Sequence, residues 1–341
     1  MTRHVEAMIV GAGPIGLACG ISAARRGVAA EIVDAGPIAR SIMRYPVGMT
    51  FFTTPERLEV GGHPLVTSGA KATREEALKY YRGVARAESL LIRPYVRLIA
   101  ADREGDSISC TLQSRLSTET VTCDQLVLAT GYFDHANLLG VPGETLGHVS
   151  HWLDEPHATN GLDVVIVGGK NSAVESALQC YRAGARVTIV YRGAEWRPSV
   201  KYWLRPDVDN RIKAGEIAAR MAADVVEITP EAVIISNAGG ERTSIPADRV
   251  YALTGYHPDF ALLESIGITI DETTGRPALN PDTLETNVPG VYLGGSVGAG
   301  RHTSEVFIEN GRYDGEKIFG DRKSRARAEA DYAFRPRQVG E

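Results

Sequence analysis

An internal repeat of a glycine-containing segment constrains the fold of this chain more than any other feature. In the first copy a short apolar run leads into Gly11, and the helical pattern that follows ends at Gly27. In the second copy the same order recurs between Gly168 and Gly184. The two glycines are 16 positions apart in both copies (27 − 11 and 184 − 168), a match that points to one structural unit used twice. Each copy predicts a strand, a tight turn, a helix and a second strand, so we expect a doubly wound α/β fold with two Rossmann-like domains.

The segments between and around the two copies predict how the domains connect. Residues 97–127 alternate polar and apolar side chains and are rich in β-branched residues, which predicts an antiparallel meander. Two similar segments, Leu128–Tyr132 and Ala252–Tyr256, bracket the second copy and predict chain crossings. The second domain is therefore expected to be inserted into the first. We expect a first domain formed by residues 1–156 and 254–325, an inserted domain of residues 157–253 and a solvated tail of residues 326–341.

Composition excludes several functions. The net charge is −5 and the 37 Lys and Arg residues are scattered among 42 Asp and Glu residues, so a nucleic-acid partner is not expected. The chain has neither a signal-peptide pattern nor an apolar run of roughly 18 residues, so we expect a cytoplasmic protein without a membrane span. The four cysteines lack C-x-x-C or metal-ligand spacing, so neither a metal site nor a disulfide scaffold is expected.

The first glycine motif predicts a dinucleotide site. Gly11 makes the tight turn, Gly13 lets a pyrophosphate approach the backbone, and Gly16 allows close packing of the helix. Asp34 lies 23 positions after Gly11 and is placed to accept hydrogen bonds from a ribose. A carboxylate there would repel a 2′-phosphate, so the motif favours FAD or NAD over NADP.

A C-terminal segment favours FAD for this first site. Thr286–Ser296 resembles the last FAD signature of flavoprotein reductases, with Ser296 in place of the usual Asp. The stretch from Thr303 to Ile318 predicts a helix whose first N–H groups would face the flavin. The predicted FAD contacts are Gly11, Gly13, Pro14, Ile15, Gly16, Asp34, Ser41, Tyr45, Phe51, Leu98, Ala129, Thr130, Gly131, Gly295, Ser296 and Thr303.

The second motif predicts NADPH. Its second strand ends in Tyr191 and Arg192 rather than in an acid, and guanidinium groups bind phosphate through paired donors. Lys170 occupies the position of the second glycine, where its side chain either contacts the ligand or points into water. The predicted NADPH contacts are Gly168, Gly169, Lys170, Asn171, Ser172, Tyr191, Arg192, Arg197, Lys201 and Gly255.

Several segments over nearly the whole chain resemble one known family. They are Ser41–Ile42, Tyr45–Pro46, Thr50–Thr54, Val167–Ala173, Gly255–Asp259 and Phe307–Gly311. They resemble the YpdA-type bacillithiol disulfide reductases, which are thioredoxin-reductase-like FAD/NAD(P)H flavoproteins without the C-x-x-C dithiol. The resemblance implies FAD, NADPH, a role in thiol–disulfide chemistry and a homodimer or homotetramer, and it makes Lys170 a family feature.

The resemblance leaves the electron acceptor open. Family members assigned to bacillithiol disulfide chemistry have Cys where this chain has Ile15, and Ile cannot attack a disulfide. Cys19, one helical turn later, is the nearest substitute, although a packing role is favoured for it. A low-molecular-weight disulfide is the expected acceptor. The alternatives are a ferredoxin- or flavodoxin-like protein, oxygen in a flavin monooxygenase suggested weakly by His148–Trp152, and slow turnover in a redox sensor.

Three histidines are candidate proton donors. His257 follows a crossing segment and His302 precedes the predicted last helix, so both are candidates to approach the flavin. His63 lies in a Gly- and Pro-containing segment and is expected to be a loop residue. A structural role is favoured for each of them.

Overall fold

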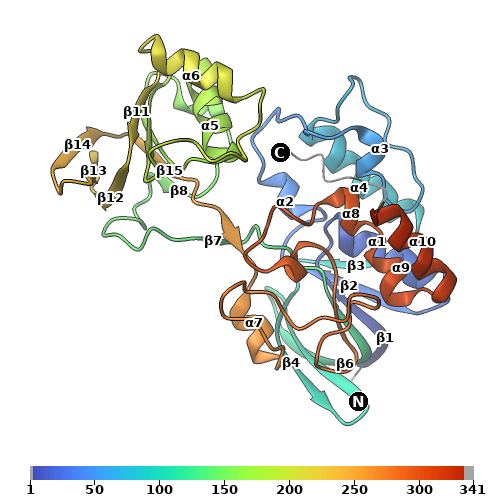
Figure 1. Cartoon of the computed structure of the whole chain (residues 1–341). Coiled ribbons are helices and arrows are strands. Elements are labelled where there is room, and N and C mark those ends of the chain that lie inside the picture. Colours follow the sequence, from blue (N-terminus) through green and yellow to red (C-terminus); the bar gives the residue numbers. More distant parts are fainter. Residues whose placement is uncertain (1–2, 334–341) are drawn as a thin grey trace. The chain divides into compact units, whose positions relative to one another are not determined.

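The computed structural model describes residues 3–333, which form two compact units. Unit 1 contains residues 3–43, 48–135 and 256–333, and unit 2 contains residues 44–47 and 136–255. The chain leaves unit 1 after residue 135 and returns at residue 256, so one unit is inserted into the other (Figure 1). The predicted α/β fold with two Rossmann-like units is confirmed.

A seven-stranded sheet forms the centre of unit 1. Its strands are β1 (Arg3–Val10), β2 (Ala30–Asp34), β3 (Leu91–Pro94), β4 (Arg97–Glu104), β5 (Ser107–Gln113), β6 (Thr118–Leu128) and β17 (Val291–Leu293). The neighbours in the order β3-β2-β1-β6 are parallel, and β17 is also parallel to β6. Strands β4, β5 and β6 are antiparallel, which confirms the predicted meander.

Strand β6 belongs to both parts of this sheet. From Thr118 to Cys123 it alternates more exposed with buried residues and pairs antiparallel with β5. Its last three residues, Leu126, Val127 and Leu128, are fully buried and pair in parallel with β17. Alternation is typical of a strand with one solvated face, and a continuous apolar run is typical of a strand covered on both faces.

Helices pack around the sheet of unit 1. They are α1 (Pro14–Ala24), α2 (Arg40–Met43), α3 (Pro55–Leu58), α4 (Arg74–Ala87), α7 (Phe260–Ser265), α8 (Ile308–Gly311), α9 (Asp314–Phe319) and α10 (Arg322–Ala333), with a 3-10 turn η2 at Gly295–Ala299. Helix α1 packs against α9 (Figure 1). Gly315 allows this close approach, because a Cβ atom there would lie 2.8 Å from the carbonyl oxygen of Ala18.

The single helix predicted from Thr303 to Ile318 is wrong. The structure has two short helices, and the first of them starts only at Ile308. Asn310 explains this start, because its side chain folds back onto the preceding loop. Its Oδ1 accepts a hydrogen bond from the Phe307 N–H at 2.8 Å, and its Nδ2 donates to the carbonyl oxygen of Glu305 at 2.9 Å. Thr303 therefore lies in a loop, and no helix begins there.

The tail predicted for residues 326–341 begins inside a helix, and most of its residues up to 330 are exposed. Arg322–Ala333 forms α10, and Asp321 caps the start of this helix by accepting a hydrogen bond from the Ser324 N–H at 2.7 Å. Ala328 is buried in spite of the charged residues around it. The remainder of the predicted tail, residues 334–341, lies outside the described residues.

Unit 2 consists of a five-stranded parallel sheet, a three-stranded antiparallel sheet and helices. The parallel strands are β8 (Val149–Ser150), β9 (Asp163–Val167), β10 (Arg186–Tyr191), β11 (Ala218–Met221) and β15 (Arg249–Ala252). The other elements are β12 (Ala223–Ile228), β13 (Ala232–Asn237), β14 (Arg242–Pro246), α5 (Asn171–Arg182), α6 (Arg205–Lys213) and a 3-10 turn η1 at Pro156–Thr159. Val165 and Val190 pack with Val233 of the small sheet, whereas Ile166 and Ile189 pack in a second core with residues of α5.

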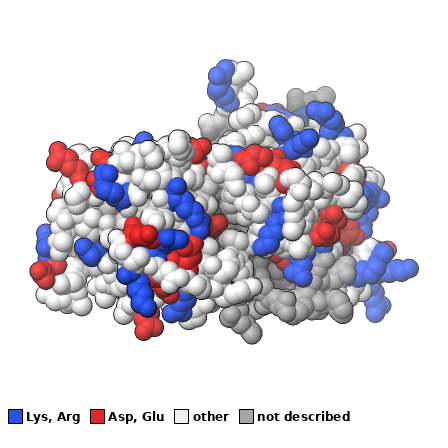
Figure 2. Space-filling view, turned by 90° about the horizontal axis from the view of Figure 1, so that it is seen from above, with Lys and Arg blue, Asp and Glu red and all other residues white. Residues whose placement is uncertain are grey.

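The chain passes between the units at two short strands, each close to a predicted crossing segment. β7 (His135–Ala136) and β16 (Tyr256–His257) form a two-stranded ribbon where the chain passes between the units. Within residues 3–333, no helix is both long enough and apolar enough to cross a membrane. The same residues contain no group of three or more His, Cys, Asp or Glu side chains arranged to hold a metal ion. Cationic and anionic side chains are interspersed on the face in Figure 2.

Candidate functional site

The first glycine turn joins β1 to α1 and has the geometry of a dinucleotide cradle. Gly11 has a φ of +112°, and a Cβ atom there would collide with the carbonyl oxygen of Ala129. A Cβ at Gly16 would collide with the carbonyl oxygen of Gly11. A Cβ at Gly13 would meet nothing within 4 Å, so this side of the turn is open to a ligand. The three glycines thus have the environments that their predicted roles require.

The start of α1 leaves backbone donors for an anion. Gly13 is the N-cap residue and has no side chain to bond the first N–H groups, and Pro14 occupies the first turn. The first N–H groups of a helix lack partners within the helix, and the helix dipole adds positive potential at this end. An 11-residue helix that begins at an open turn therefore favours a phosphate group at this position.

Asp34 is fixed at the tip of β2. One of its carboxylate oxygens accepts a hydrogen bond from the N–H of Ala12 and the other accepts from the N–H of Gly36, both at 2.7 Å. Burial raises the pKa of Asp34, whereas these two N–H groups act to lower it. The carboxylate is therefore oriented by the backbone of the first glycine turn, through Ala12, and of the loop after β2, through Gly36.

The C-terminal signature packs against the first turn around Ile15. A Cβ atom at Gly295 or Gly311 would lie 3.0 Å from the Ile15 side chain, and one at Gly294 would lie 3.4 Å from it. The three glycines therefore form a close-fitting cage for this side chain. Beneath the cage, the buried carboxyl of Asp314 accepts a hydrogen bond from the Gly295 N–H at 2.6 Å, and burial raises its pKa to about 7.

The structure brings together only part of the predicted FAD set. A Cβ at Gly131 would lie 3.7 Å from the hydroxyl oxygen of Ser296, so the first crossing segment adjoins the C-terminal signature. Ala129 and Thr130 continue β6 towards this crossing, and Ser41 lies in α2. By contrast, the side chain of Leu98 is buried in the core of the sheet.

Two predicted aromatic FAD contacts have different surroundings. Phe51 is buried in unit 1, 7% exposed, and its N–H donates to the carbonyl oxygen of Ala72 at 2.9 Å. Tyr45 lies in the short segment 44–47 that clusters with unit 2. In that segment the Val47 N–H donates to the carbonyl oxygen of Asp154 at 2.7 Å. Their stacking on a flavin stays a prediction.

The second glycine turn repeats the first with two of the three glycines replaced, by Lys170 and Ala173. Gly168 has a φ of +145°, and a Cβ there would lie 2.5 Å from the carbonyl oxygen of Leu253. Ala173 stands where the first copy has Gly16, and its Cβ would be 3.0 Å from a Cβ at Gly168. Lys170 is exposed and is the N-cap residue of α5.

Tyr191 replaces the tip carboxylate of the first copy. It lies 23 positions after Gly168, as Asp34 lies 23 positions after Gly11 (191 − 168 and 34 − 11). Its ring packs on the glycines that correspond to the two backbone partners of Asp34. A Cβ atom at Gly169 or at Gly193 would collide with ring atoms of Tyr191.

The ring of Tyr191 has a second aromatic contact, and a cationic residue follows it in the sequence. The ring of Tyr191 stacks with that of Trp196, with 6.2 Å between the centroids. The tip of β10 therefore carries an uncharged aromatic ring where β2 carries a carboxylate. Next to it, Arg192 and Arg197 are exposed.

The remaining predicted NADPH residues fall into two groups. Asn171 accepts a hydrogen bond from the Lys201 N–H at 2.8 Å and donates to the carbonyl oxygen of Ser199 at 3.0 Å, so its side chain holds the loop after β10. Lys201 is buried, with its ammonium group 5.6 Å from the ring centroid of Trp203. Ser172 is exposed on the first turn of α5. Gly255 has a φ of +96° at the second crossing.

The candidate proton donors are dispersed. His302 is exposed, and its Nδ1 lies 3.9 Å from Glu305. The ring of His257 stacks on Phe260 at 5.3 Å, and its Nδ1 lies 2.7 Å from the carbonyl oxygen of Pro258. The Nε2 atom of His63 lies 2.7 Å from a carboxylate oxygen of Glu88.

Cys19 does not support its candidate catalytic role. The residue is fully buried in α1, and burial, with a contribution from the nearby Asp314, raises the pKa of its thiol well above the usual value. A thiol attacks a disulfide as an exposed thiolate. The structure therefore favours the packing role of Cys19.

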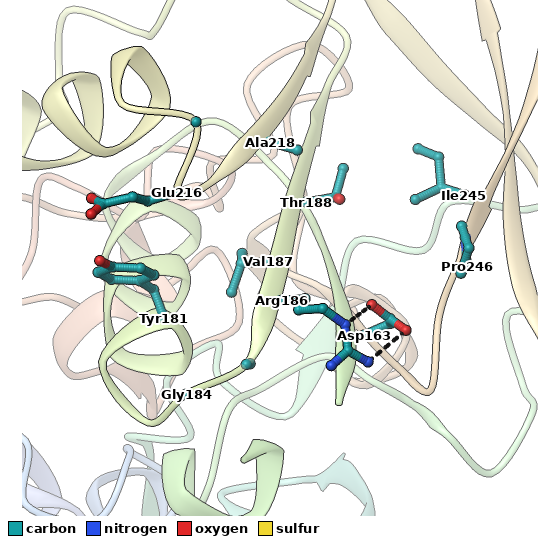
Figure 3. Close-up of a pocket in the computed structure, with 12 residues that line it drawn as sticks. Asp163, Tyr181, Gly184, Arg186, Val187, Thr188, Glu216, Ala218, Ile245 and Pro246 are labelled. Carbon is teal, nitrogen blue, oxygen red and sulfur yellow. Dashed lines mark hydrogen bonds and ion pairs between the residues drawn. The ribbon is translucent and has the colours of Figure 1, made fainter. Parts of the chain in front are cut away.

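A cavity of about 380 Å³ lies in unit 2 where strands β9 and β10 begin (Figure 3). The glycine turn follows the other end of β9. Asp163 and Arg186, the first residues of β9 and β10, line it and form an ion pair at 2.7 Å. Glu216 also lines the cavity and accepts a hydrogen bond from Arg211 at 2.8 Å. Because these charged side chains are already paired, we interpret the cavity as part of the protein surface and not as a ligand site.

Sequence reasoning missed two elements of the site. The first is Asp314, which lies far from both glycine motifs in the sequence and is followed by an ordinary helical pattern. The second is the ring packing of Tyr191, for which the only signal was the glycine two positions later. Equal offsets in the two copies, 34 to 36 and 191 to 193, would have revealed this correspondence.

Comparisons with known proteins cover both units. A family model described as pyridine nucleotide-disulphide oxidoreductase matches residues 8–295. The chain is 40% identical to Bacilliredoxin reductase Bdr of Bacillus subtilis, over 92% of this chain and 96% of that protein. Its structure is similar to that of Bacillithiol Disulfide Reductase Bdr (YpdA) from Bacillus cereus, with a TM-score of 0.91, 38% identity and coverage of 95% of this chain and 100% of the other. A Ferredoxin--NADP reductase of Ignicoccus hospitalis is 28% identical over 86% of this chain and 90% of its own length.

Proposed function

This chain belongs to the pyridine nucleotide-disulphide oxidoreductases, and on that basis we propose that it uses NADPH and FAD to reduce a low-molecular-weight disulfide of the bacillithiol type. NADPH binds unit 2, FAD binds unit 1, and the disulfide receives the electrons. The observation that carries the choice of acceptor is the likeness to a structure named Bacillithiol Disulfide Reductase Bdr (YpdA), with a TM-score of 0.91 and 38% identity over 95% of this chain.

The first turn supports FAD as the ligand of unit 1. The open space beside Gly13 admits a pyrophosphate, and the N-terminus of α1 supplies backbone donors to it. Asp34 keeps lone pairs for ribose hydroxyls while two N–H groups hold its orientation. Bound FAD would accept a hydride and pass on two electrons.

The second turn supports NADPH as the ligand of unit 2. The ring of Tyr191 removes the negative charge that would repel a 2′-phosphate, and Arg192 is exposed beside it. A guanidinium group binds a phosphate through two parallel hydrogen bonds. Asn171 orders the loop that carries Ser199 and Lys201, and so fixes the border of this phosphate site.

Rapid mixing of the purified protein with NADPH or NADH tests the cofactor assignments. Bleaching of the flavin absorbance reports hydride transfer in each case, and we expect a higher rate and tighter binding with NADPH. Equal rates and affinities for the two nucleotides would contradict the role of Arg192. Protein that stays colourless after addition of FAD would contradict the assignment of unit 1.

Steady-state turnover tests the acceptor. We expect NADPH oxidation that depends on bacillithiol disulfide and yields two thiols for each NADPH. Glutathione disulfide serves as a comparison disulfide formed from a different thiol, and ferricyanide serves as a control for electron transfer through the flavin. Ferricyanide reduction without reduction of either disulfide would contradict the proposed acceptor.

A ferredoxin-like protein is the second candidate acceptor. The likeness to a protein named Ferredoxin--NADP reductase, 28% identical over 86% of this chain, favours it. NADPH-driven reduction of a ferredoxin, with no response to either disulfide, would replace the first proposal by this one.

Light scattering of the same preparation tests the homodimer or homotetramer that we also propose.

A further inference from the structure

All four cysteines of this chain are buried, although the proposed substrate is a disulfide. The sequence contains four cysteines, and each is free and has 0% of its surface exposed: Cys19, Cys110, Cys123 and Cys180. Thiol–disulfide exchange requires a thiolate that reaches a sulfur atom of the substrate in line with its S–S bond. Each cysteine is therefore a possible attacking group only if its thiol can reach the substrate.

None of the four local environments favours such an attack. Cys19 is enclosed between α1 and the C-terminal signature, where a Cβ at Gly294 would lie 3.4 Å from its sulfur. Cys110 and Cys123 face each other inside the meander with their sulfurs 3.8 Å apart, and their mutual contact raises the pKa of Cys110. Cys180 lies in the core between α5 and the sheet of unit 2, where burial raises the pKa of its thiol to about 11.

The glycine motif offers no thiol either. Position 15 carries an isoleucine that fits the cage of Gly294, Gly295 and Gly311, with contacts of 3.0 to 3.4 Å to the Cβ atoms that these glycines lack. This close packing shows that the surroundings are shaped for a branched apolar side chain. A side chain without a nucleophilic atom therefore occupies this position of the turn.

Building on the proposed function, we infer that this chain reduces its disulfide substrate without forming a mixed disulfide on any of its own cysteines. The balance is one NADPH, one proton and one disulfide, which give NADP+ and two thiols. The S–S bond of the substrate breaks, each sulfur gains one electron and one proton, and no sulfur of the protein changes its oxidation state. The substrate class is a disulfide small enough to receive electrons directly at the flavin.

Mass spectrometry of the acid-quenched protein tests this inference by a readout other than turnover. The holoenzyme is mixed with NADPH and bacillithiol disulfide, quenched during turnover, and weighed intact. We expect the unmodified mass, and we expect no labelling when the folded protein is first treated with iodoacetamide. A bacillithiol adduct on any of the four cysteines at a stoichiometric level would overturn the inference. The variant Ile15→Cys provides the control that an adduct can be detected, because it places a thiol in the turn.

A cysteine-free variant supplies the second test. Cys19→Ala, Cys110→Ala, Cys123→Ala and Cys180→Ala are combined, and flavin absorbance with ferricyanide reduction reports whether the variant is folded. We expect disulfide-dependent NADPH oxidation within about threefold of the natural chain. A loss of more than tenfold with ferricyanide reduction intact would overturn the inference and leave the proposed function in place. If the combined variant does not fold, the four single variants under the same assay give the same two outcomes. If the untreated chain reduces ferricyanide but no disulfide, the proposed function and the inference both fail.

Discussion

Replacing Tyr191 by Asp would give the end of β10 the carboxylate that Asp34 provides at the end of β2. In unit 1 the carboxylate of Asp34 accepts hydrogen bonds from two backbone N–H groups at 2.7 Å. Gly169 and Gly193 lie at the same sequence distances from position 191 as these two donors lie from Asp34. A carboxylate at position 191 would be held in the same way and would face the 2′-phosphate of NADPH. At roughly 5 Å and an effective dielectric constant near 20, the repulsion is about 3 kcal/mol per pair of unit charges. That energy corresponds to about a 100-fold loss in kcat/KM for NADPH, since about 1.4 kcal/mol is tenfold.

Steady-state kinetics with NADPH and NADH, with ferricyanide as acceptor, measures this switch. We expect the Tyr191→Asp variant to lose its preference for NADPH, because the new carboxylate would accept hydrogen bonds from the ribose of NADH. Tyr191→Phe is the matched control, since it keeps the ring against Gly169 and Gly193 and the stacking with Trp196, and its preference should be unchanged. An Asp variant that binds FAD normally and still prefers NADPH by the original factor would refute the electrostatic argument.

Three further predictions concern charge and packing. Arg192→Gln should raise KM for NADPH about 10-fold or more and change KM for NADH little, as measured by initial rates, because it removes a paired phosphate donor. Gly311→Ala would place a Cβ 3.0 Å from Ile15, so we expect weaker FAD retention on gel filtration; unchanged retention would refute the cage. Burial raises the pKa of Asp314 from 3.8 to about 7, so its stabilising effect is fully present below pH 3.8 and is lost as the pH rises to 7. Thermal unfolding of Asp314→Asn should lack this decline, and equal pH profiles would contradict it.

The repeat made the overall fold predictable from the sequence. Apolar runs before Gly11 and Gly168, with helices ending at Gly27 and Gly184, predicted the strand, turn, helix and strand that begin each Rossmann-like unit. Such runs depend on local residue types and spacing, which a sequence displays directly. The meander was predictable for the same reason, because its alternation has a period of two residues.

The C-terminal part was less predictable because its structure depends on contacts distant in sequence. The helical pattern after Thr303 is real, but the side chain of Asn310 stops the helix from starting there. Arg322–Ala333 has charged residues on most sides and becomes a helix where Ala328 is covered. Leu98 lies on a strand of the predicted meander with its side chain in the core, and its predicted contact with FAD stays a prediction.

The shared strand β6 sets the order in which the two units can be completed during synthesis. Val291–Leu293 pairs with β6 only after the whole of unit 2 has been made, because residues 136–255 lie between them. Unit 2 has its strands β8–β15 in one uninterrupted stretch and is able to fold while the rest of the chain is still on the ribosome. Unit 1 must wait with one edge of β6 unfilled until Leu126–Leu128 receives its last neighbour. The C-terminal signature, Thr286–Ser296, contains β17, so the site proposed for FAD is complete only near the end of translation.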